Sequence, residues 1–286
     1  MKIRHDIHCH THLSLCGKDN ATIAYYVRSA RKLGLKLVGI ADHMWDEKIP
    51  FAESMRHSRS AGDGENVLNW YRAQFIPHCR EILDEIAAAD AGDIRFAFGG
   101  EVDYCPGIGA AITLEEAEKL DFMIVPNSHT HHIMDKALYE PPRKHAEFML
   151  RAAMEICTAP TAKYVTALAH PFDPVCCPYP AERVMDTIRD EEFFEVFRAA
   201  AEAGIAAEIN TACYSSLPVE SFGNLWMTHV LSIAKKAGCT FTFGSDAHSD
   251  PAQDTILLAE QVSACLGLTE NDLHPFVSYC SAYGRQ

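Results

Sequence analysis

Short apolar runs alternate along the chain with longer segments in which apolar residues recur three or four positions apart. The runs have the length of buried strands, and the longer segments have the period of amphipathic helices. The predicted strands are residues 3–8, 37–41, 94–99, 122–126, 164–169, 205–209 and 240–244. Helices are predicted between them, among others over residues 23–33, 182–203 and 225–237.

Glycines mark where several of these helices end, because Gly34, Gly204 and Gly238 each precede a predicted strand by a few residues. Strands that alternate with helices indicate βαβ units and a parallel sheet. Seven such units follow one another without a linker, which favours a closed α/β barrel over an open sheet. We therefore predict a single domain over residues 1–286.

One segment interrupts the alternation after the second predicted strand. Residues 45–64 are polar and contain Gly and Ser, and a helix-like stretch follows over residues 66–89. We interpret residues 45–90 as an insertion. In barrels the loops after the strands build the active site, so residues 45–64 are either a lid or an irregular surface loop.

Histidine and carboxylate side chains recur at the ends of the predicted strands, where a barrel would gather them on one face. Residues two apart in an extended segment point the same way, so pairs such as His8 and His10 can reach one cation. Imidazole and carboxylate ligands suit zinc, manganese and iron. The residues concerned are His8, His10, Asp42, His43, Glu101, Asp103, His129, His170, Glu208, Asp246 and His248.

Each of these motifs alone also has a structural explanation. A lone His-x-His is a weak signal, Asp42-His43 is compatible with a helix cap, and residues 246–248 are compatible with a turn. Cys9 alternates with the proposed ligands and should point away from them. Histidines interpreted as loop, surface or core residues are His131, His132, His5, His57, His78, His145, His229 and His274.

In combination the motifs resemble the PHP (polymerase and histidinol phosphatase) family over roughly residues 3–250. They are His8-Cys9-His10, Asp42-His43, Gly100-Glu101-Val102-Asp103-Tyr104, Ser128-His129, His170-Pro171 and Gly244-Ser245-Asp246-Ala247-His248. Residues 101–104, followed by Pro106-Gly107, are similar to the histidinol-phosphatase branch. The resemblance implies a distorted (β/α)7 TIM-like barrel, two or three divalent metal ions, and phosphoester hydrolysis.

The resemblance also implies roles for individual residues. His8, His10, Glu101 and Asp246 would hold a first ion, Glu101 would bridge to a second ion completed by His129 and His170, and His43 and His248 would hold a third. A further ligand that many family members place shortly after the first motif is not matched here, where Leu15 and Cys16 stand. Asp19, His12 and Cys16 are the candidates for that place, and two ions are the expected number.

The composition indicates which partners the protein can bind and where in the cell it is expected. The 25 Lys and Arg against 39 Asp and Glu give a formal charge of −14, which disfavours long nucleic acid and anionic membranes. No apolar run approaches the ~20 residues of a membrane helix, and the N-terminus lacks an apolar signal segment. The eleven cysteines contain no CxxC pair. We expect reduced thiols and a cytoplasmic location.

The expected activity is hydrolysis of a small phosphomonoester, histidinol phosphate or another, by a hydroxide held between metal ions. Glu101, Asp246, His248 and Asp42 are the predicted catalytic residues, with Asp42 or His248 protonating the leaving group. An anionic substrate needs local positive charge, for which Arg143 and Lys18 are the main candidates, with Arg56 and Arg59 in the insertion as further ones.

Three alternatives remain open at this stage. The first is a phosphodiesterase that acts on a nucleotide or a short oligonucleotide. The second, from another class, is a non-catalytic metal-binding PHP module with a structural or regulatory role. The third is an amidohydrolase that cleaves a C–N bond, which is disfavoured because no lysine stands at a predicted strand end.

Overall fold

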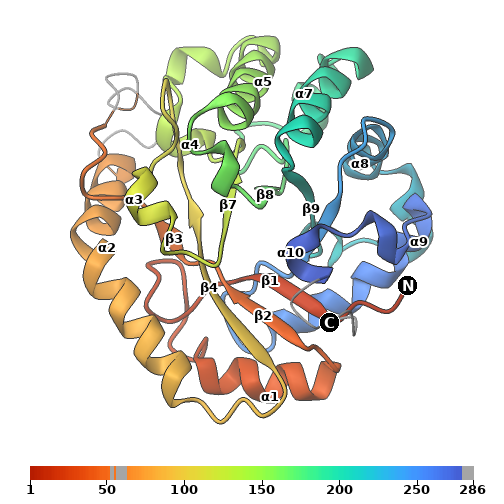
Figure 1. Cartoon of the computed structure of the whole chain (residues 1–286). Helices are drawn as coiled ribbons and strands as arrows, with labels where there is room; N and C mark the ends of the chain where they lie inside the picture. Colours follow the sequence, from red (N-terminus) through yellow and green to blue (C-terminus); the bar gives the residue numbers. More distant parts are fainter. Residues whose placement is uncertain (52–54, 56–62, 279–286) are drawn as a thin grey trace.

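The computed structural model describes residues 1–51, 55 and 63–278. Within them, seven parallel strands form the wall of a barrel in the order β1-β2-β4-β7-β8-β9-β10 (Figure 1). A short strand, β3, continues beyond β2 and pairs with β4. The strands are β1 His5–Cys9, β2 Leu37–Ile40, β3 His43–Met44, β4 Arg95–Val102, β7 Phe122–Pro126, β8 Ala167–Ala169, β9 Ala206–Asn210 and β10 Phe241–Gly244.

The barrel closes between β1 and β10, largely through side chains. One isolated bridge joins Cys9 to Ala247, where the His10 N–H donates to the Ala247 carbonyl at 2.8 Å. The buried Asp6 accepts hydrogen bonds from the backbone and hydroxyl of Ser245 at 2.9 and 2.6 Å. The predicted (β/α)7 TIM-like barrel is confirmed, with this seam as its distortion.

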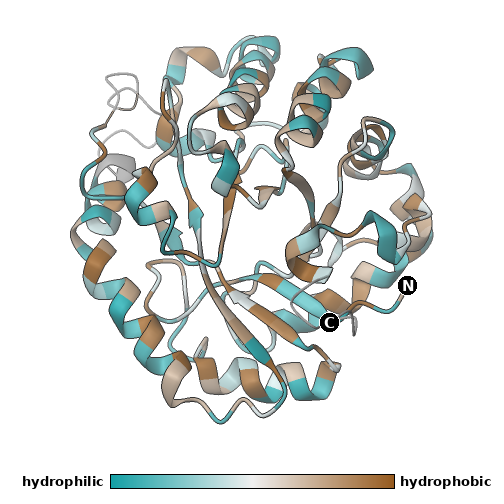
Figure 2. Cartoon of the chain, in the orientation of Figure 1, coloured by the Kyte–Doolittle hydropathy of each residue, from teal (hydrophilic) through white to brown (hydrophobic). Residues whose placement is uncertain are grey.

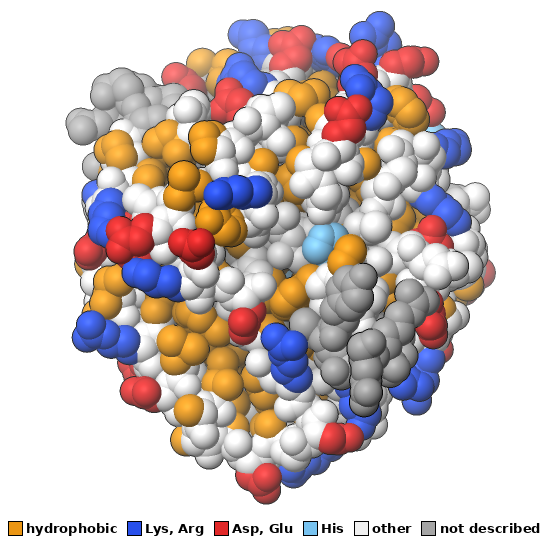
Figure 3. Space-filling model, in the orientation of Figure 1, with side chains coloured by type: hydrophobic (Ala, Val, Ile, Leu, Met, Phe, Trp, Pro, Cys, Tyr) orange, Lys and Arg blue, Asp and Glu red, His pale blue; other side chains and the backbone are white. Residues whose placement is uncertain are grey.

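Helices surround the barrel, and both apolar and polar residues occur along the long ones (Figure 2). None of the described helices has the length and apolar character needed to cross a membrane. The helices are α1 Ile23–Leu33, α2 Asp63–Ala88, α3 Leu114–Ala117, α4 Thr130–Ile133, α5 Pro142–Thr158, α6 Glu182–Met185, α7 Asp190–Ala203, α8 Trp226–Lys236, α9 Ala259–Leu266 and α10 Pro275–Val277. On the face seen in Figure 3, acidic and basic side chains are intermingled around the margin.

The structure corrects the sequence prediction in three places. The helix predicted over residues 182–203 is two helices, α6 and α7, because the chain turns at residues 186–189. Strand β4 runs on to Val102, so Glu101 lies within the strand and not after it. A two-stranded hairpin, β5 Tyr104–Cys105 with β6 Gly109–Ala110, follows β4 and was not predicted.

The insertion after the second strand is mainly the long helix α2. The described part of the preceding loop packs on the body of the protein, since Trp45 is fully buried and donates to the Ile49 carbonyl at 2.9 Å. Much of the proposed lid, including Arg56 and Arg59, lies outside the described residues. The role of residues 45–64 as a lid and the assignment of 1–286 to one domain therefore stay predictions.

Close packing inside the barrel requires glycine at Gly99 of β4. A Cβ atom at this position would lie 2.4–2.6 Å from three ring carbons of the buried Phe122 on the neighbouring strand β7. Real Cβ atoms do not approach so closely, and an aromatic ring fixed in a packed core has little room to move.

We therefore expect Gly99→Ala to destabilise the protein by about 1–3 kcal/mol through overpacking. The matched control is Gly223→Ala, because a Cβ there meets nothing within 4 Å. The midpoints of urea unfolding measure both changes. Equal midpoints for the two variants would contradict this account of the core.

Candidate metal centre

A single buried carboxylate, Glu101, lies at the centre of the candidate site. Glu101 is 1% exposed and projects from β4 at the carboxyl end of the barrel. Five histidine rings from four other strand ends approach its two oxygens at distances of 2.9–3.5 Å; they are His8, His10, His43, His129 and His170. The sequence prediction that these strand ends converge is thus met by the geometry.

Three of these histidines are oriented by side-chain oxygens that contact their Nδ1 atoms, on the side of the ring away from Glu101. Nδ1 of His8 lies 2.7 Å from Glu208, Nδ1 of His129 lies 3.1 Å from Asp103, and Nδ1 of His170 lies 2.8 Å from the Ser128 hydroxyl. Each contact leaves Nε2 directed at Glu101. Such partners are the usual means of orienting histidines that bind metal ions. The sequence had indicated Asp103 as a strand-end carboxylate and Ser128 as part of a motif, but not that either residue orients a histidine ring.

Asp246 supplies a second carboxylate to the same cluster. Its Oδ1 lies 3.4 Å from Nε2 of His8 and 3.2 Å from Nε2 of His10. The Asn210 amide donates to its other oxygen at 3.1 Å. Asp246 and His170 both have positive φ angles, 53° and 26°, which non-glycine residues rarely adopt. The backbone is therefore strained at two of the candidate ligands.

The carboxylates and histidines shift one another's proton affinities. Burial alone would raise the pKa of Glu101, but the surrounding histidines hold it well below its usual range. Burial alone would lower the pKa of His43, but Glu101 raises it to about 9. Glu208, Asp246 and Glu101 likewise raise the pKa of His8 above its ordinary value despite burial. The cluster thus has a strong affinity for positive charge.

Donor atoms in this region come together in four groups, with the atoms of each group within 4.8 Å of one another. The groups are His8, His10 and Asp246; His8, Glu101 and His170; His43, Asp103 and His129; and His10, Cys16, His43 and His248. Imidazole and carboxylate are the ligands that zinc, manganese and iron take in proteins. The donor set therefore fits divalent metal ions.

Asp42 is placed differently from the prediction. It is fully buried and accepts hydrogen bonds from the backbone and hydroxyl of Thr11, both at 2.6 Å. His78 of α2 lies 2.9 Å from its second oxygen. With these partners, and away from the cavity wall, Asp42 is poorly placed to protonate a leaving group. It anchors the loop that follows β1, and His78, interpreted as a surface or core residue, is buried against it.

Neither predicted phosphate-binding side chain lies at the cavity. Arg143 at the start of α5 pairs with Glu192 of α7 at 2.6 Å and with Glu147 at 2.9 Å, and it also donates to the Thr187 carbonyl. Its donors are therefore used in holding α5 and α7 together. Lys18 is exposed, and its backbone N–H donates to the His248 carbonyl at 2.9 Å.

The candidate ligands open onto a cavity of about 380 Å³, and its wall also includes histidines that the sequence indicated as loop residues. His131 and His132 of α4 line it with their ring centroids 3.8 Å apart, and Tyr71 of the inserted helix α2 lines it beside His43. Burial lowers the pKa of His132 to about 4, so this ring is neutral at pH 7. Among the described lining residues there is no lysine or arginine.

Comparisons with known proteins support the fold. No protein-family model matches the sequence, and no curated protein matches it. The structure is similar to the crystal structure of histidinol phosphate phosphatase (HISK) from Lactococcus lactis subsp. lactis Il1403 in complex with zinc, L-histidinol and phosphate. The TM-score is 0.59 at 18% sequence identity, over 93% of this chain and 94% of that chain. The two proteins therefore share a barrel fold along nearly their whole length.

Metal binding should compete with protons at the cluster. Because Glu101 raises the pKa of His43 to about 9, zinc affinity of the metal-free protein should keep rising with pH up to about 9. Unperturbed histidines, with a pKa near 6.5, would give affinities that level off about one unit above that value. Competition titrations with a chromophoric chelator between pH 6 and 9 measure this. A plateau from pH 7.5 upward would contradict the electrostatic description.

Proposed function

We propose that the protein is a metal-dependent phosphoester hydrolase of the PHP type that acts on a small phosphomonoester. The observation that carries the proposal is the set of five histidines, from four strand ends, directed at the buried Glu101. A buried array of this kind has little use in packing, because each polar group inside a protein must find a partner. The barrel shared with a zinc-containing phosphatase supports the same interpretation.

The proposed ligands follow from the geometry. His8, His10, Glu101 and Asp246 would hold one ion; Glu101, His129 and His170 would hold a second. Zinc, manganese and iron all suit these donors, and zinc is the ion in the similar phosphatase. When bound, such ions acidify a water molecule and neutralise phosphoryl oxygens. Glu208, Asp103 and Ser128 keep the histidine rings in place through their Nδ1 atoms.

The cavity wall bears on the choice of substrate. The aromatic and imidazole side chains of Tyr71, His131 and His132 line the cavity beside the proposed ligands and offer a surface for the leaving group. The similar phosphatase holds L-histidinol and phosphate. Because Arg143 is paired elsewhere, the negative charge of a phosphate would be met by the ions themselves and by neighbouring histidines, not by a guanidinium.

The cavity wall is also compatible with a second candidate function, a phosphodiesterase that acts on nucleotide-sized substrates. A diester carries one negative charge and makes less demand on basic side chains than a monoester dianion does. The described lining residues, which include no lysine or arginine, favour this candidate. Long nucleic acid is disfavoured as a substrate by the net charge of −14.

We also propose that the protein works in the cytoplasm.

The central test is the variant Glu101→Ala. We expect it to remove phosphoester hydrolysis by more than about a hundredfold, because even changes to residues behind metal ligands cost 10–100-fold. The protein should stay folded, because the histidines around Glu101 can give up their protons once the carboxylate that raises their pKa is gone. Hydrolysis of a panel of phosphomonoesters, phosphodiesters and amides, with added zinc or manganese, measures the effect.

Glu220→Ala is the matched control, because Glu220 is an exposed glutamate in the 3-10 helix η5 Val219–Asn224. It should retain full activity. Circular dichroism establishes that both variants are folded. Wild-type turnover by Glu101→Ala would contradict the mechanism. Amide cleavage without phosphoester cleavage would favour the amidohydrolase, and metal binding without any turnover would favour a non-catalytic module.

A further inference from the structure

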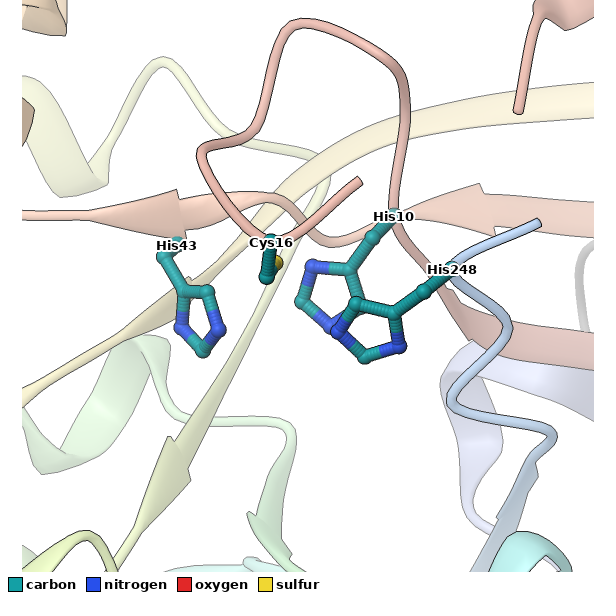
Figure 4. Close-up of side chains that lie close together, drawn as sticks. All are labelled: His10, Cys16, His43 and His248. Carbon is teal, nitrogen blue, oxygen red and sulfur yellow. The ribbon is translucent and has the colours of Figure 1, made fainter. Parts of the chain in front are cut away.

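One group of donor atoms contains a cysteine. Cys16 lies in the loop after β1 and joins His10, His43 and His248, with one donor atom of each within 4.8 Å of the others. In Figure 4 the three imidazole rings stand around the Cys16 sulfur, and all four side chains face one another. The four residues come from three strand ends, so their meeting is a property of the barrel and not of one local motif.

The nitrogens not engaged elsewhere are the ones that face this group. Nδ1 of His43 is 3.1 Å from Glu101, which leaves its Nε2, and Nδ1 of His248 lies 2.7 Å from the Asp246 carbonyl, which likewise leaves Nε2. His10 directs Nε2 towards Asp246. Its Nδ1 is completely buried without a hydrogen-bond partner, 3.8 Å from Asp42, and it points towards Cys16 (Figure 4).

The loop holds Cys16 in this place through several backbone contacts. Asp42 fixes Thr11 by two hydrogen bonds, and the Lys18 N–H donates to the His248 carbonyl at 2.9 Å. Between them the chain turns so tightly that a Cβ at Gly17 would lie 1.9 Å from the Thr11 carbonyl oxygen. Only glycine permits this approach. The sulfur is partly buried, with the Ser14 hydroxyl 3.1 Å away.

The other candidates for this ligand lie elsewhere. His12 directs Nε2 to Glu85 of α2 at 3.4 Å. Asp19 is exposed. Neither belongs to a group of potential metal ligands among the described residues. Of the three residues that the sequence left open, Cys16 alone reaches the cluster.

We propose that Cys16 is a thiolate ligand of a third metal ion, bound together with His43 and His248 beside the two ions of the proposed hydrolase. A thiolate is a soft ligand, so this position would select zinc over manganese, whereas the histidine and carboxylate positions accept both. Fully buried His10 would hold the neighbouring ion through Nε2, while its Nδ1 faces the group with Cys16 (Figure 4). A metal-bound Nε2 has no proton to give, so His248 serves here as a ligand and not as the leaving-group acid.

Cobalt(II) is the probe, because a thiolate bound to cobalt gives an intense near-ultraviolet charge-transfer band that histidine and carboxylate do not give. The metal-free full-length protein is titrated with cobalt as the wild type, Cys16→Ser, Cys16→His and Cys265→Ser. Cys265 is an exposed cysteine on α9 and serves as the matched control. We expect the band in the wild type and in Cys265→Ser, and its loss in both Cys16 variants.

Zinc counting after gel filtration adds a second readout. Cys16→Ser should retain one zinc ion fewer per chain than the wild type, and Cys16→His should restore the count without restoring the cobalt band. The proposal is overturned if the band persists in Cys16→Ser, or if the wild type binds cobalt without the band. These outcomes test only the Cys16 proposal. The proposed hydrolase is tested separately, because cobalt bound by histidines and carboxylates at the other two positions is followed by its visible absorption and not by the thiolate band.

Discussion

The site depends on the burial of one carboxylate among many histidines. Glu101 is shielded from water, and five imidazole rings lie within 3.5 Å of its oxygens. Desolvation of a lone carboxylate costs far more than a protein fold usually tolerates, so positive charge must be present nearby. Protons on the histidines supply it in the metal-free protein, and divalent ions would supply it in their place. The packing of the barrel therefore favours positive charge around Glu101.

The barrel meets this requirement through its topology. Parallel strands place all their carboxyl ends on one face, so each strand end needs to contribute only one or two side chains to the cluster. A layer of further polar residues, Glu208, Asp103 and Ser128, then fixes the ring orientations. The inserted helix α2 closes one side of the cavity with Tyr71 and supports Asp42 from behind through His78. Site and scaffold are thus built from the same strands.

Much of this arrangement was predictable from the sequence because its signals are local. Apolar runs located β2, β7 and β10 almost to the residue, and motifs such as His8-Cys9-His10 indicated candidate ligands through the two-residue alternation of a strand. The remaining features depend on contacts between distant segments. The pairing of Arg143 with Glu192, and of Asp42 with His78, follows from how helices pack. The placement of Cys16 depends on a glycine turn and on a hydrogen bond to the far end of the chain.

The central claim is that the strand-end residues hold divalent ions, and metal content per chain tests it most directly. Protein purified without chelator or affinity nickel would be measured by elemental analysis. The account predicts two or three equivalents of zinc, manganese or iron per chain. Near-zero metal, with none regained when these ions are added back, would contradict it.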